Sequence, residues 1–342
     1  MRVLYIGGTG EISYECVRAS VSAGQEVTVF NRGRSAEPLL AEVRRIIGDV
    51  QDDAGYAPLG QEHFDVVCQF LAYRPETIRR DREVFGGKVG QYVFISTASA
   101  YQKPPRRVHV TEDVPLENPY WAYSRAKAQM ERELTAWHAA GTLPVTIVRP
   151  SHTYRRRFPG TFARGDDWAW RMLNGRAIIS HGDGTSLWML THSRDFATPF
   201  VRLLGNEKAL GEAFHITTDQ AEPWDSIFHA IGAALGVQPR LVHVPTETLV
   251  RYNAEWAGPL LGDKAWPVIF DNAKVRSVAG AFECTTPMAE GMKEVAARHY
   301  PARAAAYEPN EELHALLDRI AEEQLALGGG GRPGQGGASG KA

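Results

Sequence analysis

Tyr123 and Lys127 are the two residues of this chain whose types and spacing point most directly to chemistry. Residues four apart on a helix lie on one face, so a helix through this stretch places the two side chains together. A lysine ammonium favours the charged form of a neighbouring phenol, which predicts a lowered pKa for Tyr123. Such a tyrosine can exchange a proton with a substrate hydroxyl or carbonyl near neutral pH.

Hydroxyl side chains in the run over residues 96–99 form a second candidate group. This run follows an apolar stretch, residues 91–96, which has the composition of a buried strand. The carboxyl ends of parallel strands line the ligand crevice of a doubly wound sheet. Thr97 and Ser99 therefore become candidates to hold the same substrate oxygen that Tyr123 would protonate or deprotonate.

A glycine cluster near the N-terminus is typical of a dinucleotide site. An apolar strand over residues 3–7 leads into Gly7, Gly8 and Gly10, and an amphipathic helix follows over residues 14–23. In such a turn, backbone N–H groups at the helix N-terminus approach a pyrophosphate, and the helix dipole favours its negative charge. Ser13 stands where a third glycine is usual, and we expect it to pack against the strand.

Apolar segments separated by helical stretches predict a parallel sheet with helices on both faces. Right-handed crossovers then give a Rossmann-type, doubly wound α/β fold. The expected strands cover residues 3–7, 27–31, 44–47, 65–71, 91–96, 145–149 and 214–217. Beside the first helix, we expect helices over residues 76–85, 120–138, 196–204, 224–235 and 311–327.

The domain organisation follows from a change in character after Pro150. Residues 1–152 and about 186–218 are expected to form the dinucleotide-binding domain. Residues 153–185 and 219–310 are expected to form a smaller substrate-binding cap. The first of these segments lacks clean periodicity, so we expect it to be a loop region that covers the substrate. A C-terminal helix over 311–327 and a disordered Gly-rich tail over 328–342 complete the prediction.

Composition limits the classes of partner. The formal net charge of −2 gives no reason to expect nucleic acid or an anionic membrane. No apolar run is long enough to span a bilayer, and the first apolar residues form a strand rather than a signal peptide, which favours a cytoplasmic protein. Three scattered cysteines indicate reduced thiols, and we expect no metal site.

Taken together, these motifs resemble the short-chain dehydrogenase/reductase superfamily in its extended form, the NAD(P)-dependent epimerase/dehydratase family. The residues that carry the resemblance are Gly7, Gly10, the run over 96–99, Tyr123, Lys127, Arg149 and Pro150. Segments 30–33, 48–49 and 182–197 are similar to an atypical branch that includes the chloroplast stem-loop-binding proteins. By this resemblance Tyr101 closes the motif after the fifth strand, which makes Thr97 the catalytic hydroxyl and Ser99 the alternative.

The resemblance also implies which positions bind the dinucleotide. They are Gly7, Gly10, Glu11, Ile12, Asn31, Arg32, Arg34, Asp49, Val50, Leu71, Ala72, Tyr73, Lys127, Pro150 and His152. Asp49 and Val50 would contact the adenine, and Lys127 would bind the nicotinamide ribose. For Asp49 and His152 a purely structural role remains open.

The end of the second strand bears on the choice between NADP and NAD. NAD sites usually place an acidic residue there to bind the ribose 2′-hydroxyl, whereas this chain has Asn31 followed by Arg32 and Arg34. Asparagine does not repel a 2′-phosphate, and guanidinium groups pair with it, so NADP is favoured. The alternative is NAD bound through Asn31, with both arginines solvated.

Substrate recognition is the point at which the resemblance weakens. Sugar-nucleotide epimerases usually carry an arginine four residues before the histidine that corresponds to His192, and here that residue is Trp188. An indole offers an apolar or stacking wall and does not neutralise phosphate. The positive charge would then come from Arg155, Arg156, Arg157 or Arg194. The alternative is that the run over residues 155–157 is a solvated basic loop. Asp195 is expected to cap the helix over residues 196–204.

These observations predict an epimerase or oxidoreductase that acts on a secondary hydroxyl or ketone of a sugar, nucleoside or similar polar ring. One alternative is an NADPH-dependent ketoreductase of secondary metabolism, and another is a non-catalytic Rossmann-fold protein that binds RNA. The expected partner is a small molecule. A homodimer through the helices over residues 76–85 and 120–138 is also expected.

Overall fold

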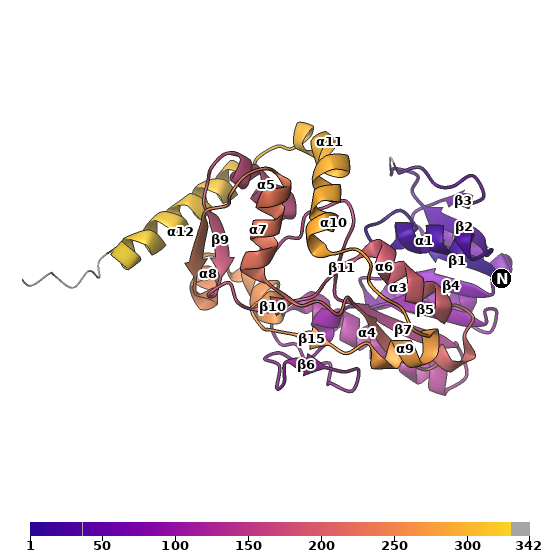
Figure 1. Ribbon diagram of the computed structural model, residues 1–342. Coiled ribbons are helices and arrows are strands. Elements are labelled where there is room, and N and C mark those ends of the chain that lie inside the picture. The colour runs from indigo at the N-terminus through magenta and orange to yellow at the C-terminus, as the bar shows by residue number, and fades with distance from the viewer. Residues whose placement is uncertain (36, 330–342) are drawn as a thin grey trace, which may run out of the picture.

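The computed structural model describes residues 1–35 and 37–329, and its centre is a seven-stranded parallel sheet (Figure 1). The strand order is β12-β7-β5-β4-β1-β2-β3, which confirms the predicted doubly wound α/β fold. The strands are β1 (Arg2–Ile6), β2 (Glu26–Asn31), β3 (Arg44–Ile47), β4 (Val66–Gln69), β5 (Gln91–Ile95), β7 (Val145–Pro150) and β12 (Ala213–Ile216).

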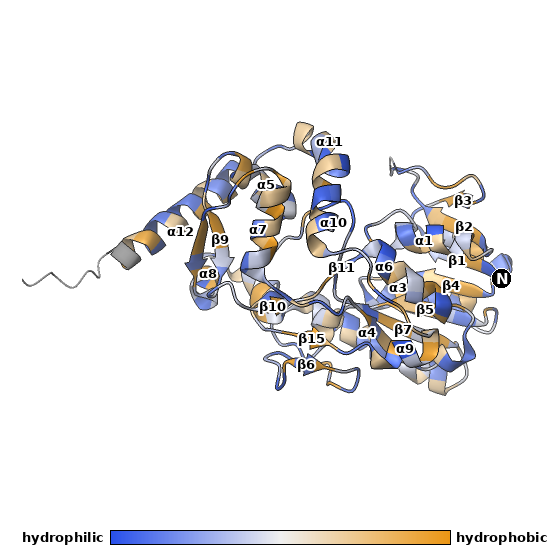
Figure 2. Ribbon diagram, viewed as in Figure 1, coloured by the Kyte–Doolittle hydropathy of each residue, from blue (hydrophilic) through white to orange (hydrophobic). Residues whose placement is uncertain are grey.

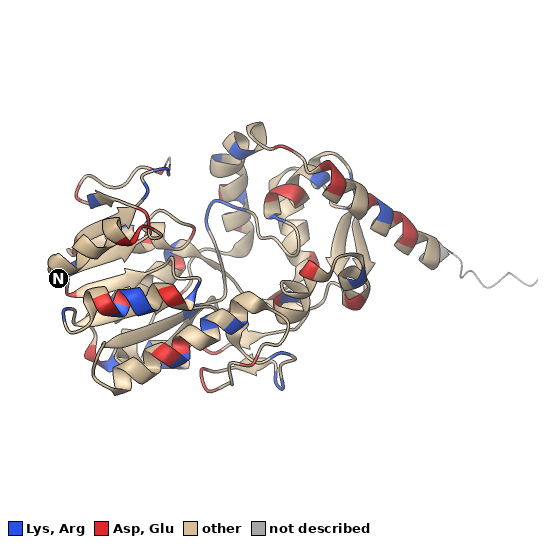
Figure 3. Cartoon of the chain, turned by 180° about the vertical axis from the view of Figure 1, so that it is seen from behind, with Lys and Arg blue, Asp and Glu red and all other residues tan. Residues whose placement is uncertain are grey.

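Helices cover both faces of this sheet, which explains why its central strands are almost continuously apolar. One face packs against α1 (Ser13–Ser22), α6 (Ser193–Leu203) and α9 (Ala273–Ala279). The other face packs against α3 (Pro75–Phe85) and α4 (Ala122–Ala139), whose outer surfaces carry charges of both signs (Figure 3). The homodimer expected through α3 and α4 stays a prediction.

A second apolar core lies beside the sheet and forms the cap. Its centre combines the parallel strands β9 (Ile178–His181) and β14 (Leu241–Val244) with helices α5 (Gly165–Leu173) and α7 (Trp224–Ala234). Figure 2 shows apolar strands and mixed helix surfaces in both parts. The other cap helices are α8 (Thr246–Tyr252), η4 (Ala254–Ala257), η5 (Leu260–Lys264), α10 (Met288–Glu294), η6 (Val295–His299), α11 (Tyr300–Ala305) and α12 (Glu311–Gly329).

Short elements connect the two parts. Three further two-stranded pairings join β8 to β11, β10 to β13 and β6 to β15. These strands are β6 (His109–Val110), β8 (His152–Tyr154), β10 (Leu187–Trp188), β11 (Leu190–His192), β13 (Glu222–Pro223) and β15 (Ile269–Phe270). The remaining helical turns are α2 (Asp53–Tyr56), η1 (Ala57–Gln61), η2 (Ala98–Ala100) and η3 (Glu207–Ala209).

The expectation that residues 153–185 lack regular structure is wrong, because this segment contains β8, α5 and β9. Helix α5 begins with a reciprocal capping arrangement between Arg164 and Asp167, which satisfies backbone groups at its first turn. Trp168 and Met172, four residues apart, are buried in the cap core. The glycines and arginines around them obscure this helical spacing in the sequence.

Two domain boundaries also differ from the sequence prediction. Val275 and Ala279 of α9 pack into the core beside the sheet, although residues 219–310 were assigned to the cap. Leu317 and Ile320 of α12 pack into the cap core, so this helix is part of the cap rather than a separate element. The predicted tail lies, from residue 330 on, outside the described residues.

Within residues 1–35 and 37–329, no helix is both long enough and apolar enough to cross a bilayer.

Candidate active site

One large cavity, of about 970 Å³, lies at the carboxyl ends of the sheet strands and extends to the cap. The glycine turn after β1 lines one part of it, and Tyr123, Thr97 and Lys127 line another. This is the position at which open α/β sheets bind their ligands. The sequence-predicted cofactor and catalytic groups therefore share one cavity.

The glycine turn is built so that backbone can approach a ligand closely. Gly7 and Gly8 have φ values of +119° and +81°, in the region that favours glycine. A Cβ on Gly8 would lie 2.7 Å from the methyl groups of Val29, so a side chain does not fit there. Ser13 is buried at the start of α1, and its hydroxyl accepts a 3.0 Å hydrogen bond from the Gly10 N–H. These features fit a pyrophosphate cradle.

Lys127 connects two neighbouring strands of the sheet. Its ammonium, almost fully buried on α4, donates hydrogen bonds of 2.8 Å to the Ala72 carbonyl and 2.7 Å to the Ile95 carbonyl. Its Nζ lies 5.9 Å from the centre of the Tyr123 ring. The two side chains are thus neighbours, as the helical spacing predicts, and the lysine N–H groups point to backbone.

The predicted lowering of the Tyr123 pKa by Lys127 is contradicted. The pKa of Tyr123 is raised to about 12, mainly by burial and then by the neighbouring Tyr73 phenol, while a hydrogen bond with Thr97 partly offsets both. Burial also lowers the pKa of Lys127 to about 7, so its positive charge is weakened where the phenol would need it. Tyr123 is consequently protonated at neutral pH in this structure.

The two candidate hydroxyls after β5 form one chain of contacts. The Thr97 and Ser99 oxygens lie 3.0 Å apart, and Ser99 Oγ lies 2.8 Å from the hydroxyl of Ser124 at the start of α4. Both residues line the cavity, but Ser99 is buried and Thr97 is partly exposed. Thr97 is better placed to meet a ligand oxygen, and Ser99 orients it.

Most of the predicted cofactor positions line the cavity. Those that do are Gly7, Gly10, Glu11, Ile12, Asn31, Arg32, Arg34, Asp49, Val50, Leu71, Tyr73, Lys127, Pro150 and His152. Ala72 is the exception, because it is fully buried and contributes only the carbonyl that Lys127 binds. Burial lowers the pKa of His152 to about 3, so this imidazole is neutral at physiological pH.

The Glu11 carboxylate links the glycine turn to the cap. It accepts hydrogen bonds from the backbone N–H groups of Arg155 and Arg156, at 3.1 and 2.9 Å, and from the Arg156 guanidinium. Arg156 also pairs with Glu37 at 3.1 Å. These partners neutralise a carboxylate that would otherwise repel a pyrophosphate at the turn.

The structure brings only Trp188 of the three predicted substrate residues to the cavity. Arg155 is buried outside its lining, where it pairs with Glu37 at 3.0 Å and covers the Tyr14 ring. It is therefore neither a cavity charge nor a solvated loop residue. His192 is also buried outside the lining.

His192 replaces Asp195 as the residue that caps α6, since its Nδ1 accepts a 3.2 Å hydrogen bond from the Arg194 N–H. The Asp195 carboxylate instead accepts hydrogen bonds from the backbone of Thr285 and Thr286. The expected capping role of Asp195 is therefore wrong, because a segment 90 residues away binds this carboxylate.

Sequence reasoning missed four groups at the cap side of the site. Lys103, Trp121 and Asp263 line the cavity. The buried Asn118 amide donates to the carbonyls of Ser99 and Gly262, at 2.7 and 2.6 Å, and so ties η5 to the hydroxyl loop. The asparagine lies five residues before Tyr123, but nothing local to it indicates a partner 144 residues later.

The sheet order defines a Rossmann-type doubly wound fold, with its largest described cavity at the carboxyl ends of the strands. The model of the NAD dependent epimerase/dehydratase family matches residues 83–217. This segment is therefore similar to that family, in agreement with the resemblance that the motifs indicate.

Individual relatives include both binding proteins and enzymes. The chain is 31% identical to the chloroplast stem-loop binding protein of 41 kDa b of Arabidopsis thaliana over 71% of its own length and 65% of that protein. It is 27% identical to the 2′-dehydrokanamycin reductase of Streptomyces kanamyceticus, over 83% of this chain and 80% of that enzyme. Among solved structures, the NAD complex of UDP-glucose 4-epimerase from Thermus thermophilus superimposes with a TM-score of 0.69. That match covers 88% of this chain and all of the epimerase, and its 19% identity supports the fold alone.

Proposed function

We propose that the protein is an NAD(P)-dependent epimerase or reductase that acts on a secondary hydroxyl or ketone of a sugar, nucleoside or similar polar ring. The observation that carries this proposal is the shared cavity, in which the glycine turn and the Tyr123, Thr97 and Lys127 side chains meet. The dinucleotide, when bound, supplies or accepts hydride. The chain itself supplies the proton and the orientation.

Proton transfer is assigned to Tyr123, with Thr97 as its partner. When the substrate is a ketone, the Tyr123 hydroxyl donates its proton to the carbonyl oxygen, and the Thr97 hydroxyl donates a hydrogen bond to the same atom. When the substrate is an alcohol, Tyr123 must first become phenolate. Because burial raises the pKa of Tyr123 to about 12, the protonated form dominates at neutral pH, and this is the form that donates the proton in reduction.

The same residues are also compatible with epimerisation. In that reaction a hydroxyl is first oxidised to a ketone, with its proton passing to Tyr123, and the ketone is then reduced from its opposite face, with the proton returned by Tyr123. The name of the 2′-dehydrokanamycin reductase relative supports the reductive alternative, and the named sugar epimerases among the matches support the other.

The dinucleotide proposal rests on residues at both ends of the cavity. The amides of the glycine turn would hold the pyrophosphate, and Asp49 with Val50 would border the adenine. Lys127 would bind ribose hydroxyls from the opposite side. Titration with NADPH and NADH, followed by nicotinamide fluorescence, should show saturable binding of at least one of them. Native mass spectrometry of the purified protein offers a second measurement, and absence of binding in both experiments would contradict the proposal.

NADP is the cofactor that we propose for this site. The Asn31 side chain donates to the Gly7 carbonyl at 3.2 Å and accepts from the Gly33 N–H at 2.8 Å, which fixes its orientation. Unlike an acidic residue, it carries no negative charge that would repel a 2′-phosphate. Arg32 and Arg34 line the cavity beside it. The description of the family, and the NAD complexes among its solved members, support NAD as the alternative.

Replacing both Arg32 and Arg34 by alanine should therefore weaken NADPH binding by about tenfold, because each charge-assisted contact to a 2′-phosphate is lost. NADH affinity should change by less than about twofold, since NADH lacks that phosphate. Fluorescence titration of both nucleotides measures the ratio. Arg18→Ala, an exposed substitution on α1, is the matched control, and equal losses for both nucleotides would favour the NAD alternative.

A further inference from the structure

Three charged side chains are buried at the cap end of the cavity. Lys103 follows η2, and Asp263 and Lys264 end the π-helical segment η5. Their exposed fractions are 4%, 8% and 7%, respectively. Buried charges are unfavourable unless they are paired, so each needs a partner or a ligand.

Asp263 and Lys264 are paired with each other, whereas Lys103 has no such partner among the described residues. Lys264 Nζ donates a 2.9 Å hydrogen bond to the Asp263 carboxylate. The Lys103 ammonium lines the cavity and forms no hydrogen bond or ion pair with any described residue. Burial lowers the pKa of Lys103, while the charges of Asp263 and Lys264 act on it with opposite signs. When all three side chains are charged, the group carries one more positive than negative charge, and Lys103 is the cation that lines the cavity.

Two aromatic side chains lie beside Lys264, the other lysine of this group. The Lys264 ammonium lies 5.8 Å from the centre of the Trp121 ring and 5.6 Å from that of Trp188. Both indoles line the cavity. A flat or ring-shaped substrate can pack against such surfaces while a polar substituent reaches the lysine.

The group is fixed relative to the proton-transfer residues. Asn118 binds both the Ser99 carbonyl and the Gly262 carbonyl, so the hydroxyl loop and η5 are held together. The Asp263 charge contributes to the raised pKa of Tyr123, which places it within electrostatic range of the phenol. A ligand bound at Lys103 is therefore oriented with respect to Tyr123.

We infer that Lys103 forms a substrate subsite for an anionic substituent, a carboxylate or a phosphate, carried by the ring substrate. The inference rests on the proposed function and specifies its substrate class. An anion at Lys103 would compensate the buried ammonium with a charge-assisted hydrogen bond. A polycationic aminosugar would instead meet an unpaired positive charge. Trp188, which does not neutralise phosphate, then contributes a wall while Lys103 contributes the charge.

Calorimetric titration of the NADPH-saturated protein tests this inference with four probes. These are glucose and three compounds that each differ from it at one position, namely glucose 6-phosphate, glucuronate and glucosamine. At least one anionic probe should bind at least about tenfold more tightly than glucose, since hydrogen bonds to charged groups have about this effect. The phosphate and carboxylate probes distinguish the two sources of the anion. Equal binding of glucose or glucosamine, or no binding of either anion, would overturn the inference.

Lys103→Met should reduce the affinity for the anionic probe by about tenfold to a hundredfold. Lys103→Arg keeps the charge and should retain most of the affinity, which separates charge from folding. Lys208→Met, at an exposed lysine of η3, is the surface control. Unchanged anion affinity in Lys103→Met would contradict the subsite. NADPH titration of the same variants shows separately whether the dinucleotide site, and with it the proposed function, is present.

Discussion

Tyr123→Phe is expected to lower kcat by about 10² to 10⁴-fold, the range in which a positioned proton-transfer group contributes to catalysis. The substitution removes one hydroxyl and keeps the ring, which packs 5.1 Å from the Trp121 ring. Affinity for the dinucleotide should change by less than about twofold, because the glycine turn and Lys127 are untouched. Steady-state kinetics and nucleotide titration on the same preparation measure both quantities.

Tyr120→Phe, three residues earlier and exposed, provides the control for this substitution. The pH dependence gives a further readout in the wild type. Because the pKa of Tyr123 is about 12, the phenolate fraction at any pH below that value increases about tenfold for each unit by which the pH is raised. The rate of alcohol oxidation should rise with it. Turnover of Tyr123→Phe equal to that of the wild type would remove Tyr123 from the mechanism.

Local sequence patterns were sufficient to predict those site residues that lie on a single helix or on consecutive elements. Tyr123 and Lys127 share a helix, so their spacing alone predicted that they are neighbours. Thr97 was found because it directly follows an apolar run that ends at the crevice. The glycine turn was likewise visible, since its strand, turn and helix are consecutive in the chain.

Contacts between distant segments account for the errors. Asp195 binds a segment 90 residues away, and Arg155 pairs with Glu37 across 118 residues, so neither partner follows from a local motif. The pKa of Tyr123 depends on how deeply the folded chain buries it, which no spacing reveals. Lys103 and Asp263 line the same cavity only because segments 160 residues apart in the chain fold together.

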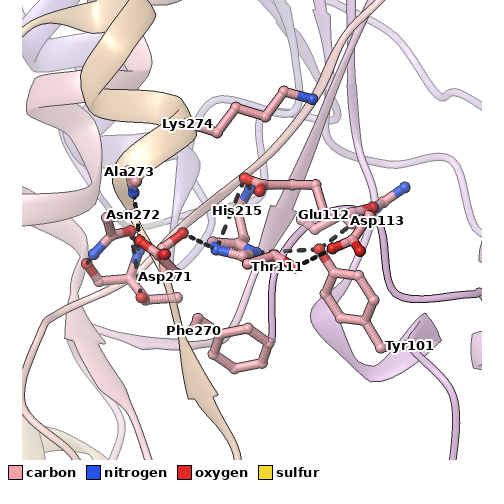
Figure 4. A network of polar contacts seen from close by, with 12 residues as sticks. Tyr101, Thr111, Glu112, Asp113, His215, Phe270, Asp271, Asn272, Ala273 and Lys274 are labelled. Atoms are coloured by element: carbon pink, nitrogen blue, oxygen red, sulfur yellow. Dashed lines mark hydrogen bonds and ion pairs between the residues drawn. The ribbon is translucent and has the colours of Figure 1, made fainter. Parts of the chain in front are cut away.

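Figure 4 shows a polar network next to the sheet, whose members also come from distant segments of the chain. The Tyr101 hydroxyl lies 3.1 Å from His215 Nδ1 and accepts a 3.1 Å hydrogen bond from Arg149. The backbone N–H of His215 donates to the Glu112 carboxylate at 3.2 Å. Arg149 thus joins β7 to the β6 segment, and through Glu131 it also reaches α4.

Replacing Arg149 by methionine should reduce the free energy of unfolding by about 3–5 kcal/mol, as expected when one partner of a buried ion pair is removed. Glu131 has an exposed fraction of 2% and accepts hydrogen bonds of 3.1, 3.0 and 2.6 Å from Arg149. Without them a carboxylate is left buried beside the sheet. Urea denaturation followed by circular dichroism measures the loss.

The same helix offers a matched control. Glu133, two residues after Glu131, accepts hydrogen bonds of 2.9 and 2.8 Å from Arg79, but this second pair is exposed. Arg79→Met should therefore change stability by only about 0–1 kcal/mol. The double variant Glu131→Leu with Arg149→Met should recover much of the loss, because no isolated charge remains. If Arg149→Met proved no more destabilising than Arg79→Met, burial of the ion pair would not be what makes Arg149 important for the fold.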